Sequence, residues 1–396
     1  MQHMDSPSRS LDESLQALRD ACPLLKTHIY LANCSQGPLA NPVRATLESF
    51  IDDWAAMGMH WDAWIEEVER ARAAFAALIG AQPGEIAVGS SVSQLVSSLA
   101  SALANSPSTT SRRIITSVAE FPGVAHAWLA LRAAGYTVDV LQGRHAGIIT
   151  EDDLVESLDT STTLVSCPHV CYANGMLLDL ERVAQAAHAH GSLIFVDAYQ
   201  SIGTIPIDVK ASGVDFLAAG TLKYLLGTAG IAFLYVNPAL LETLHPTVTG
   251  WFGRVEPFAF DPFHLDYASS AARFDLGTPN IVNAYAARAA MQLIRAAGVE
   301  RIRQQIQRLS ALAYRLAPQL GLHILGPQDM QHKGTTTALQ TDSAEQAHQL
   351  EATLRQRGII VSARNQAIRL APHGFTREEE LEQAMQAVAT MLHNGK

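Results

Sequence analysis

The chain lacks the sequence signals of several large protein classes. No apolar stretch reaches the roughly 18 residues that a membrane-spanning helix requires. The polar N-terminus, MQHMDSPSRSLDES, has no apolar core of the kind found in secretory signals. Basic residues are outnumbered: 28 Lys and Arg stand against 38 Asp and Glu, the net charge is −10, and no basic run of five occurs. We therefore expect neither a membrane protein nor a nucleic-acid-binding groove.

Cysteine is also scarce. The four cysteines, Cys22, Cys34, Cys167 and Cys171, form no C-x-x-C pair, and no second pair completes a zinc site. We predict no metal site and a reduced, cytoplasmic setting. Two phosphate-binding signatures are missing as well. No G-x-G-x-x-G follows the first strand, which argues against a Rossmann dehydrogenase, and no Walker lysine follows the Gly/Ser loop near residue 90.

What the chain does contain is an alternation of short apolar strands and alanine-rich helices, starting at about residue 86. This alternation predicts an α/β fold with a mostly parallel sheet covered on both faces. The predicted strands are 113–117, 136–141, 163–167, 192–197, 215–219 and 230–236. The predicted helices include 43–79, with a weak point at Gly58, then 91–104, 123–134 and 179–190.

The pattern changes towards both ends of the chain. Residues 1–30 are expected to form an N-terminal arm with a short helix, and residues 31–280 a large domain. After about residue 280, helices at 281–297 and 299–319 precede strand–helix–strand elements. We predict a smaller α+β domain over residues 281–396, and the N-terminal segment is a candidate to pack with it.

Two titratable residues follow apolar strands in the segment LIFVDAYQSIGTIPIDVKASGVDFLAAGTLKYLLGTAGIAFLYV. Asp197 ends the first strand, and Lys223 follows the second, flanked by leucine and tyrosine. A buried lysine with a lowered pKa suits imine formation, and a carboxylate can hold a pyridine nitrogen protonated. Each residue taken alone has an ordinary alternative: Lys223 as a surface lysine with a buried stem, and Asp197 as a helix N-cap.

Three further features add to this pair. Ser91 and Val92 lie in a Gly/Ser loop that opens a helix, a position that suits a phosphate. Phe121, in the motif EFPG, follows a strand and could stack on a flat ring. Gln200 could donate to a phenolate oxygen. A serine N-cap, core packing and a polar loop are the respective alternatives. The phosphate loop, the aromatic, the acid and the lysine nevertheless occur in this order along the chain, and the last three each come after or at the end of a predicted strand.

Together these motifs resemble the class V aminotransferase family of fold-type I pyridoxal phosphate enzymes. That group includes kynureninases, cysteine desulfurases and isopenicillin-N epimerase-like proteins. The resemblance runs from about Tyr30 to Met391 and is strongest in the segment around Asp197 and Lys223. EFPG, GWFG, RFDLGTPN and IRLAPHGFTREEEL support it. It implies a three-layer large domain with a seven-stranded, mostly parallel sheet, and a smaller α+β C-terminal domain.

The resemblance also implies roles for single residues toward pyridoxal 5'-phosphate. Lys223 would bind the cofactor as an aldimine, and Asp197 would pair with the ring nitrogen. Phe121 would stack on the ring, and Gln200 would contact the phenolate oxygen. The residues that would hold the phosphate are Ser91, Val92 and Thr221.

Four more residues take roles toward the substrate or a second subunit. Arg369 would clamp the substrate's α-carboxylate, and Asn33 would line the substrate pocket. Trp251 and Thr278 would reach the phosphate of a neighbouring subunit, which implies a homodimer with shared active sites.

Some positions depart from the family pattern. Leu222 precedes the lysine where many relatives carry His or Tyr, and Tyr172 stands where some carry Asn. No cysteine follows Cys171, which disfavours the persulfide mechanism of cysteine desulfurases. Cys34 is a conceivable pocket thiol, although a small loop residue is the simpler interpretation. His169 is a candidate to lie near the cofactor, with a packing role as the alternative.

We expect a pyridoxal phosphate enzyme that acts on a small amino acid by transamination or Cβ-elimination. The preference for a small substrate rests on the absence of an evident second cationic clamp. Kynureninase-type hydrolysis and epimerisation stay open. A catalytically silent binding protein of the same fold is the alternative from another class, and the presence of Lys223, Asp197 and Arg369 argues against it.

Overall fold

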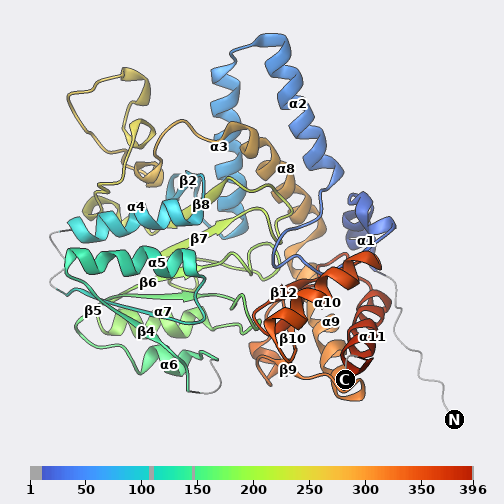
Figure 1. Cartoon of the computed structure of the whole chain (residues 1–396). Coiled ribbons are helices and arrows are strands. Elements are labelled where there is room, and N and C mark those ends of the chain that lie inside the picture. The colour runs from blue at the N-terminus through green and yellow to red at the C-terminus, as the bar shows by residue number, and fades with distance from the viewer. Residues whose placement is uncertain (1–10, 107–110, 145–147, 395–396) are drawn as a thin grey trace.

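The computed structural model describes residues 11–106, 111–144 and 148–394, so the first ten residues of the predicted N-terminal arm lie outside it. At its centre is a seven-stranded sheet with the order β2-β8-β7-β6-β5-β3-β4 (Figure 1). The strands are β2 (Ile86–Gly89), β3 (Arg113–Ser117), β4 (Thr137–Leu141), β5 (Thr162–Pro168), β6 (Leu193–Asp197), β7 (Phe216–Gly220) and β8 (Ala232–Val236). Within the described ranges, no helix is both long and apolar enough to cross a membrane.

The sheet is mostly parallel, as predicted. Strands β4, β3, β5, β6 and β7 run in one direction, and β8 lies antiparallel between β7 and β2. The six predicted strands match the observed ones to within two residues at either end. The strand β2 was not predicted, because its four residues form too short an apolar run to signal a strand.

Helices cover both faces of the sheet, which gives the predicted three layers. Successive strand side chains point to opposite faces. Phe195 and Phe216 pack in one core with α4 (Val92–Asn105) and α5 (Pro122–Ala130). Ile194, Leu217 and Phe233 pack in another core with α3 (Trp61–Leu78), α7 (Leu180–Ala189) and α8 (Ile281–Ala297). The short helix α6 (Glu151–Val155) precedes β5.

A helical hairpin projects from this body (Figure 1). The prediction of one helix over 43–79 is wrong: α2 (Asn41–Met57) ends before α3 begins. Gly58, the weak point in the pattern, lies between the two helices with φ of 67°. Glycine adopts this positive φ at little cost, so the chain turns there rather than continuing the helix.

The C-terminal part has its own antiparallel sheet, with the order β12-β13-β10-β9. Its strands are β9 (Ile324–Leu325), β10 (Thr337–Gln340), β12 (Ser362–Arg364) and β13 (Ala367–Leu370). The helices α9 (Val299–Gln319), α10 (Ala344–Gln356) and α11 (Glu378–Asn394) accompany it, and all contribute to a separate apolar core.

The N-terminal segment packs against this C-terminal part. Strand β1 (Ile29–Tyr30) pairs in parallel with β11 (Ile359–Ile360). Arg19, in α1 (Glu13–Asp20), forms an ion pair with Glu380, with Nη2 and Oε1 2.7 Å apart. The loop after β1 is thereby held beside the small sheet. The domain boundaries near residues 30 and 280 stay predictions.

Candidate active site

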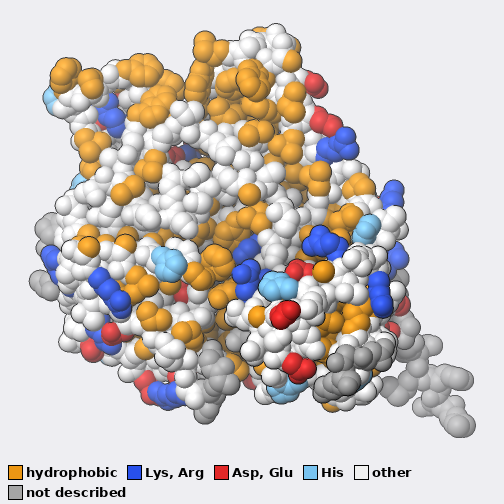
Figure 2. Space-filling model, in the orientation of Figure 1, with side chains coloured by type: hydrophobic (Ala, Val, Ile, Leu, Met, Phe, Trp, Pro, Cys, Tyr) orange, Lys and Arg blue, Asp and Glu red, His pale blue; other side chains and the backbone are white. Residues whose placement is uncertain are grey.

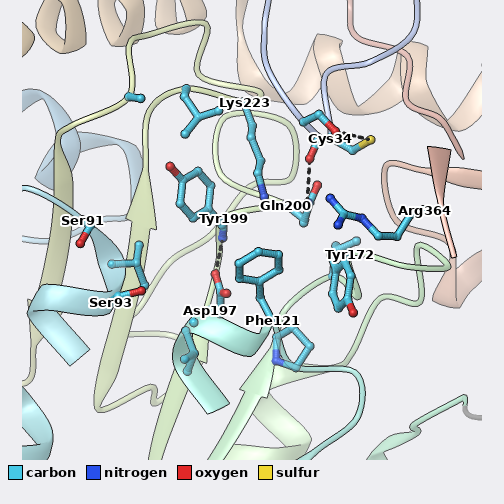
Figure 3. Close-up of a pocket in the computed structure, with 18 of the residues that line it drawn as sticks. Cys34, Ser91, Ser93, Phe121, Tyr172, Asp197, Tyr199, Gln200, Lys223 and Arg364 are labelled. Carbon is cyan, nitrogen blue, oxygen red and sulfur yellow. Dashed lines mark hydrogen bonds between the residues drawn. The ribbon is translucent and has the colours of Figure 1, made fainter. Parts of the chain in front are cut away.

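A pocket of about 410 Å³ lies at the edge of the large sheet where its parallel strands end (Figure 3). This is the edge at which open α/β sheets bind ligands, and the volume is in the usual range for small-molecule sites. The structure brings seven of the predicted site residues together in its lining. They are Ser91, Val92, Phe121, Asp197, Gln200, Lys223 and Arg369.

Lys223 follows β7 and points its amine into the pocket between two aromatic rings (Figure 3). Its Nζ lies 4.4 Å from the ring centroid of Tyr199 and 5.4 Å from that of Phe121. Burial lowers the pKa of Lys223 from 10.5 to about 8, the charge of Asp197 opposes this change, and the guanidinium groups of Arg369 and Arg364 add to it. Roughly a tenth of the amine is therefore neutral at pH 7, far more than for an ordinary lysine.

Asp197 ends β6, and its Oδ1 accepts a hydrogen bond from the Tyr199 amide at 2.8 Å. Burial raises the pKa of Asp197, while that hydrogen bond and the nearby Lys223 lower it. Glu120, which begins the EFPG motif, is buried close by. Burial and the charge of Asp197 raise the pKa of Glu120 well above its usual value. Two such carboxyls do not both ionise readily, so we assign the proton to Glu120 and the charge to Asp197.

One end of the pocket is formed by the N-terminus of α4. Ser91 is its N-cap, and the Ser91 Oγ accepts from the Gln94 amide at 3.1 Å. The first amides of a helix have no partner within the helix, and the helix dipole is positive at this end. With the hydroxyl groups of Ser90 and Ser93 also in the lining, this end is suited to bind an anion without a lysine or arginine beside it.

Arg369, from β13, lines the pocket and is 1% exposed. Its strand pairs with β12, which carries Arg364, and Figure 3 shows Arg364 on the side of the pocket away from Ser91. Its Nη1 donates to the carbonyl of Tyr172 at 2.8 Å, and its Nη2 donates to Ser362 Oγ at 2.7 Å and to Ser35 Oγ at 3.1 Å. Its Nε has no hydrogen-bond partner in the described structure. All three acceptors are neutral, so the buried guanidinium lacks a counter-charge. A carboxylate group of a ligand would supply one.

Two predicted residues lie behind the pocket rather than in its lining. Thr221 is buried, and its Oγ1 donates to the Thr228 carbonyl at 2.8 Å. Asn33 does not line the pocket, contrary to expectation, because its Nδ2 turns to the Ala371 carbonyl at 2.8 Å. Asn33 thus ties the N-terminal loop to the end of β13, next to Arg369.

Two others lie outside the lining. Trp251 packs in an aromatic cluster with Phe252, Phe258 and Phe260. Thr278 is exposed. Neither residue lines the pocket of its own chain.

Four positions left open by the sequence now have locations. Leu222, Cys34 and Tyr172 all line the pocket, and the ring of Tyr172 meets Phe121 edge to face with centroids 5.3 Å apart. His169 does not line it. Its ring is fully buried, burial lowers its pKa to about 4, and its backbone amide donates to the Asp197 carbonyl. A packing role therefore describes His169 better than contact with a cofactor.

Sequence reasoning missed three residues of the site: Glu120, Tyr199 and Arg364. The first two stand inside motifs that the sequence had singled out, directly before Phe121 and two residues after Asp197. Arg364 lies at the end of β12 and points into the pocket near Tyr172 (Figure 3). The sequence showed no sign of a second cationic side chain in the substrate pocket, and the structure places Arg364 in its lining.

Comparison with known proteins agrees with this geometry. The sequence model described as "Aminotransferase class-V" matches residues 29–377. An uncharacterized aminotransferase, YcbU, from Bacillus subtilis (strain 168) is 38% identical over 371 residues, which cover 94% of this chain and 96% of that protein. A kynureninase from Geobacillus thermodenitrificans (strain NG80-2) is 30% identical, covering 97% of this chain and 94% of that one.

A solved structure has the same fold. The apo structure of a cysteine desulfurase from Thermococcus onnurineus NA1 superposes with a TM-score of 0.85 and 22% identity, covering 98% of this chain and 99% of that one. This likeness bears on the fold alone. The match of the family model over most of the chain, and the relatives that span its length, show that this protein belongs to the class V aminotransferase family.

Proposed function

We propose that this protein converts an amino acid by transamination or by Cβ-elimination, with Lys223 as the catalytic lysine. As a member of the class V aminotransferase family it is an enzyme, and its cofactor is pyridoxal 5'-phosphate. The observation that carries the proposal is one pocket with an amine of pKa about 8, a buried carboxyl and an anion-binding helix end.

The residues of the pocket fit this cofactor. The N-terminus of α4, with Ser91 and Val92, would hold the phosphate, and Thr221 would support it from behind. Phe121 would cover the ring, and Asp197 would face the ring nitrogen. The amide nitrogen of Gln200 donates one of its two hydrogens to the Cys34 carbonyl at 3.0 Å, and its second N–H would donate to the phenolate oxygen.

When bound, pyridoxal phosphate supplies a conjugated ring that spreads negative charge from the carbon next to the substrate's amine. The chain's own residues do the remaining work. Arg369 orients the substrate by its α-carboxylate, and the neutral amine of Lys223 accepts the proton of the α-carbon. The site so described supports the steps that transamination and elimination share.

The further course of the reaction stays open between these two, with one specific alternative. Kynureninase-type hydrolysis is favoured by a relative of that name at 30% identity over nearly the whole chain. Epimerisation has no such observation behind it. The persulfide mechanism stays disfavoured, because no cysteine follows Cys171, and the pocket thiol is that of Cys34 in the N-terminal loop. A silent binding protein is disfavoured by the retained Lys223.

We further propose a homodimer with shared active sites. Large exposed apolar side chains gather on α2 and on the segment 255–265, including Trp54, Phe260 and Phe263. Figure 2 shows this apolar surface on the two lobes at the top of the molecule. A second copy would cover it, as in most two-fold oligomers. Trp251 and Thr278 would then reach the phosphate bound by the other subunit.

The size of the particle in solution tests this part of the proposal. Light scattering on a sizing column is expected to give twice the chain mass, and Phe263→Asp should shift the protein toward the monomer. A monomeric wild-type protein would contradict it. A cytoplasmic location belongs to the same proposal, since all four cysteines are buried and free.

Absorbance spectroscopy tests the proposed chemistry. Wild-type protein incubated with pyridoxal phosphate and desalted should keep the visible band of the lysine-bound cofactor. Lys223→Ala should lose that band, while Lys26→Ala, a change at an exposed lysine outside the pocket, should keep it. Amino acids should then alter the wild-type band and release a keto acid, ammonia or both. A protein that takes up no cofactor would refute the proposal.

A further inference from the structure

Arg364 and Arg369 belong to one β-hairpin and project from the same face of it. Ser362 in β12 pairs directly with Arg369 in β13, and Arg364 pairs with Ala367. Residues that pair across two strands share a face, and so do residues two apart along one strand. The two arginines therefore lie on a single face, two residue positions apart along the hairpin, a step of about 7 Å. Both line the pocket.

In the part of the chain that the structure describes, neither guanidinium has an acidic partner. Among the described residues, no carboxylate forms an ion pair with Arg364, and the partners of Arg369 are hydroxyl groups and a carbonyl. The only acidic residue in the described lining of the pocket is Asp197, next to Lys223. Both arginines lower the pKa of Lys223, as cations that face the same space would do. Within its described lining, this end of the pocket thus has two positive charges and no negative one.

The two arginines differ in exposure. Arg369 is buried at the base of the hairpin, whereas Arg364 is exposed at its tip, next to a turn in which Asn365 has φ of 50°. The buried guanidinium is the better partner for the group that every amino-acid substrate carries, the α-carboxylate. Arg364 lies further out on the same face and is still directed into the pocket (Figure 3), so it is available to bind a group on the side chain of the substrate.

We propose that Arg364 binds a second anionic group and that the substrates are acidic amino acids, with a carboxylate on the side chain. The inference rests on the proposed function and sharpens it, because it replaces the expected small amino acid by a dicarboxylic one. A planar guanidinium suits a carboxylate through two parallel hydrogen bonds. A neutral side chain of equal length leaves Arg364 without a partner and gains nothing from it.

A binding experiment tests the inference without turnover. Glutarate and its mono-amide, which differ by one charge, are titrated into the cofactor-loaded protein by calorimetry. Wild type should bind glutarate roughly tenfold to hundredfold more tightly, the usual worth of one charge-assisted hydrogen-bonded contact. Arg364→Gln should bind both ligands about equally, and Arg364→Lys should restore part of the preference. Arg357→Gln, which changes an exposed arginine outside the pocket, should behave as wild type.

Steady-state kinetics separates failure of this inference from failure of the proposed function. In wild type, kcat/KM should be higher for glutamate or aspartate than for glutamine or asparagine, and Arg364→Gln should remove most of that difference. If neutral amino acids react as well as acidic ones, or if Arg364→Gln keeps the preference, the inference is wrong while the proposed function stands. If no amino acid reacts or changes the cofactor's absorbance, the proposed function itself is wrong.

Discussion

The two ends of the pocket bind anions by different means. At one end, the N-terminus of α4 offers backbone amides and the hydroxyl groups of Ser91 and Ser93. At the other, the hairpin β12–β13 offers the charged side chains of Arg364 and Arg369. The first end belongs to the large sheet and the second to the C-terminal part of the chain. Helix amides are fixed in place and suit a group that stays bound, whereas long charged side chains can bind and release a substrate.

The largest expected effect comes from breaking the arginine end. Arg369→Gln removes the buried positive charge, so we expect kcat/KM for amino acids to fall about a hundredfold or more, in line with the 2–5 kcal/mol typical of a buried charge pair. The affinity for pyridoxal phosphate should change little. Steady-state kinetics and cofactor titration measure the two quantities. If Arg369→Gln lowered the affinity for the cofactor as strongly as it lowered kcat/KM for the amino acid, the two ends would not be separate sites.

A change at the serine end should weaken binding of the cofactor rather than of the substrate, and the effect should be smaller. Ser91→Ala removes the N-cap of α4 and a hydroxyl of the proposed phosphate site. We expect a loss of about 1 kcal/mol in stability, the usual cost of a lost cap, and about tenfold weaker cofactor binding.

Ser343 gives a matched control for that change. It is the N-cap of α10, where its Oγ accepts from the Gln346 amide at 3.1 Å, and it does not line the pocket. Ser343→Ala should lose similar stability in urea unfolding while cofactor affinity stays unchanged. Equal cofactor affinities in the two variants would mean that the α4 terminus does not hold the phosphate.

The lysine between the two ends should respond to pH. Its pKa in the folded protein is about 8, below the ordinary 10.5, so the folded state favours the neutral amine. Uptake of pyridoxal phosphate by cofactor-free protein should therefore accelerate as pH rises through about 8.

The same shift has a stability consequence: the unfolded chain binds more protons between these two pKa values, so the cofactor-free protein should gain stability as pH rises through this range. Stopped-flow absorbance and urea unfolding measure the two effects, and a midpoint near 10 would contradict the burial argument.

The smallest expected effect concerns Glu120. Its pKa is raised in the folded state, so the stability from its protonated form is complete below its unfolded pKa near 4.5 and declines as pH rises. Glu120→Gln keeps the shape of the side chain and cannot ionise. Its unfolding free energy should fall less between pH 5 and pH 8 than that of wild type. If the unfolding free energies of wild type and Glu120→Gln fell equally between pH 5 and pH 8, Glu120 would not be a buried, protonated acid.

The sequence identified Ser91 at one end of the pocket and Arg369 at the other, but it did not identify Arg364. Apolar runs and turn residues predict the strands that precede Asp197 and Lys223, so these two residues could be located at one sheet edge. Ser91 was found from the Gly/Ser loop that opens a helix, although the strand before it was not predicted. Arg364 was missed because its position depends on the register of a short hairpin in another part of the chain, which no local pattern sets. Glu120 was missed for a related reason. Its raised pKa results from burial and from the nearby charge of Asp197, and both depend on the tertiary structure.

Attachment of the cofactor to Lys223 is the central claim, and peptide mass spectrometry tests it most directly. The cofactor-loaded protein is reduced with borohydride, digested and mapped. We predict the added mass of the reduced cofactor on the peptide that contains Lys223. Lys333 is the sharpest competitor, since burial lowers its pKa to about 7, but it does not line the pocket. Modification of Lys333, or of no lysine at all, would contradict the account.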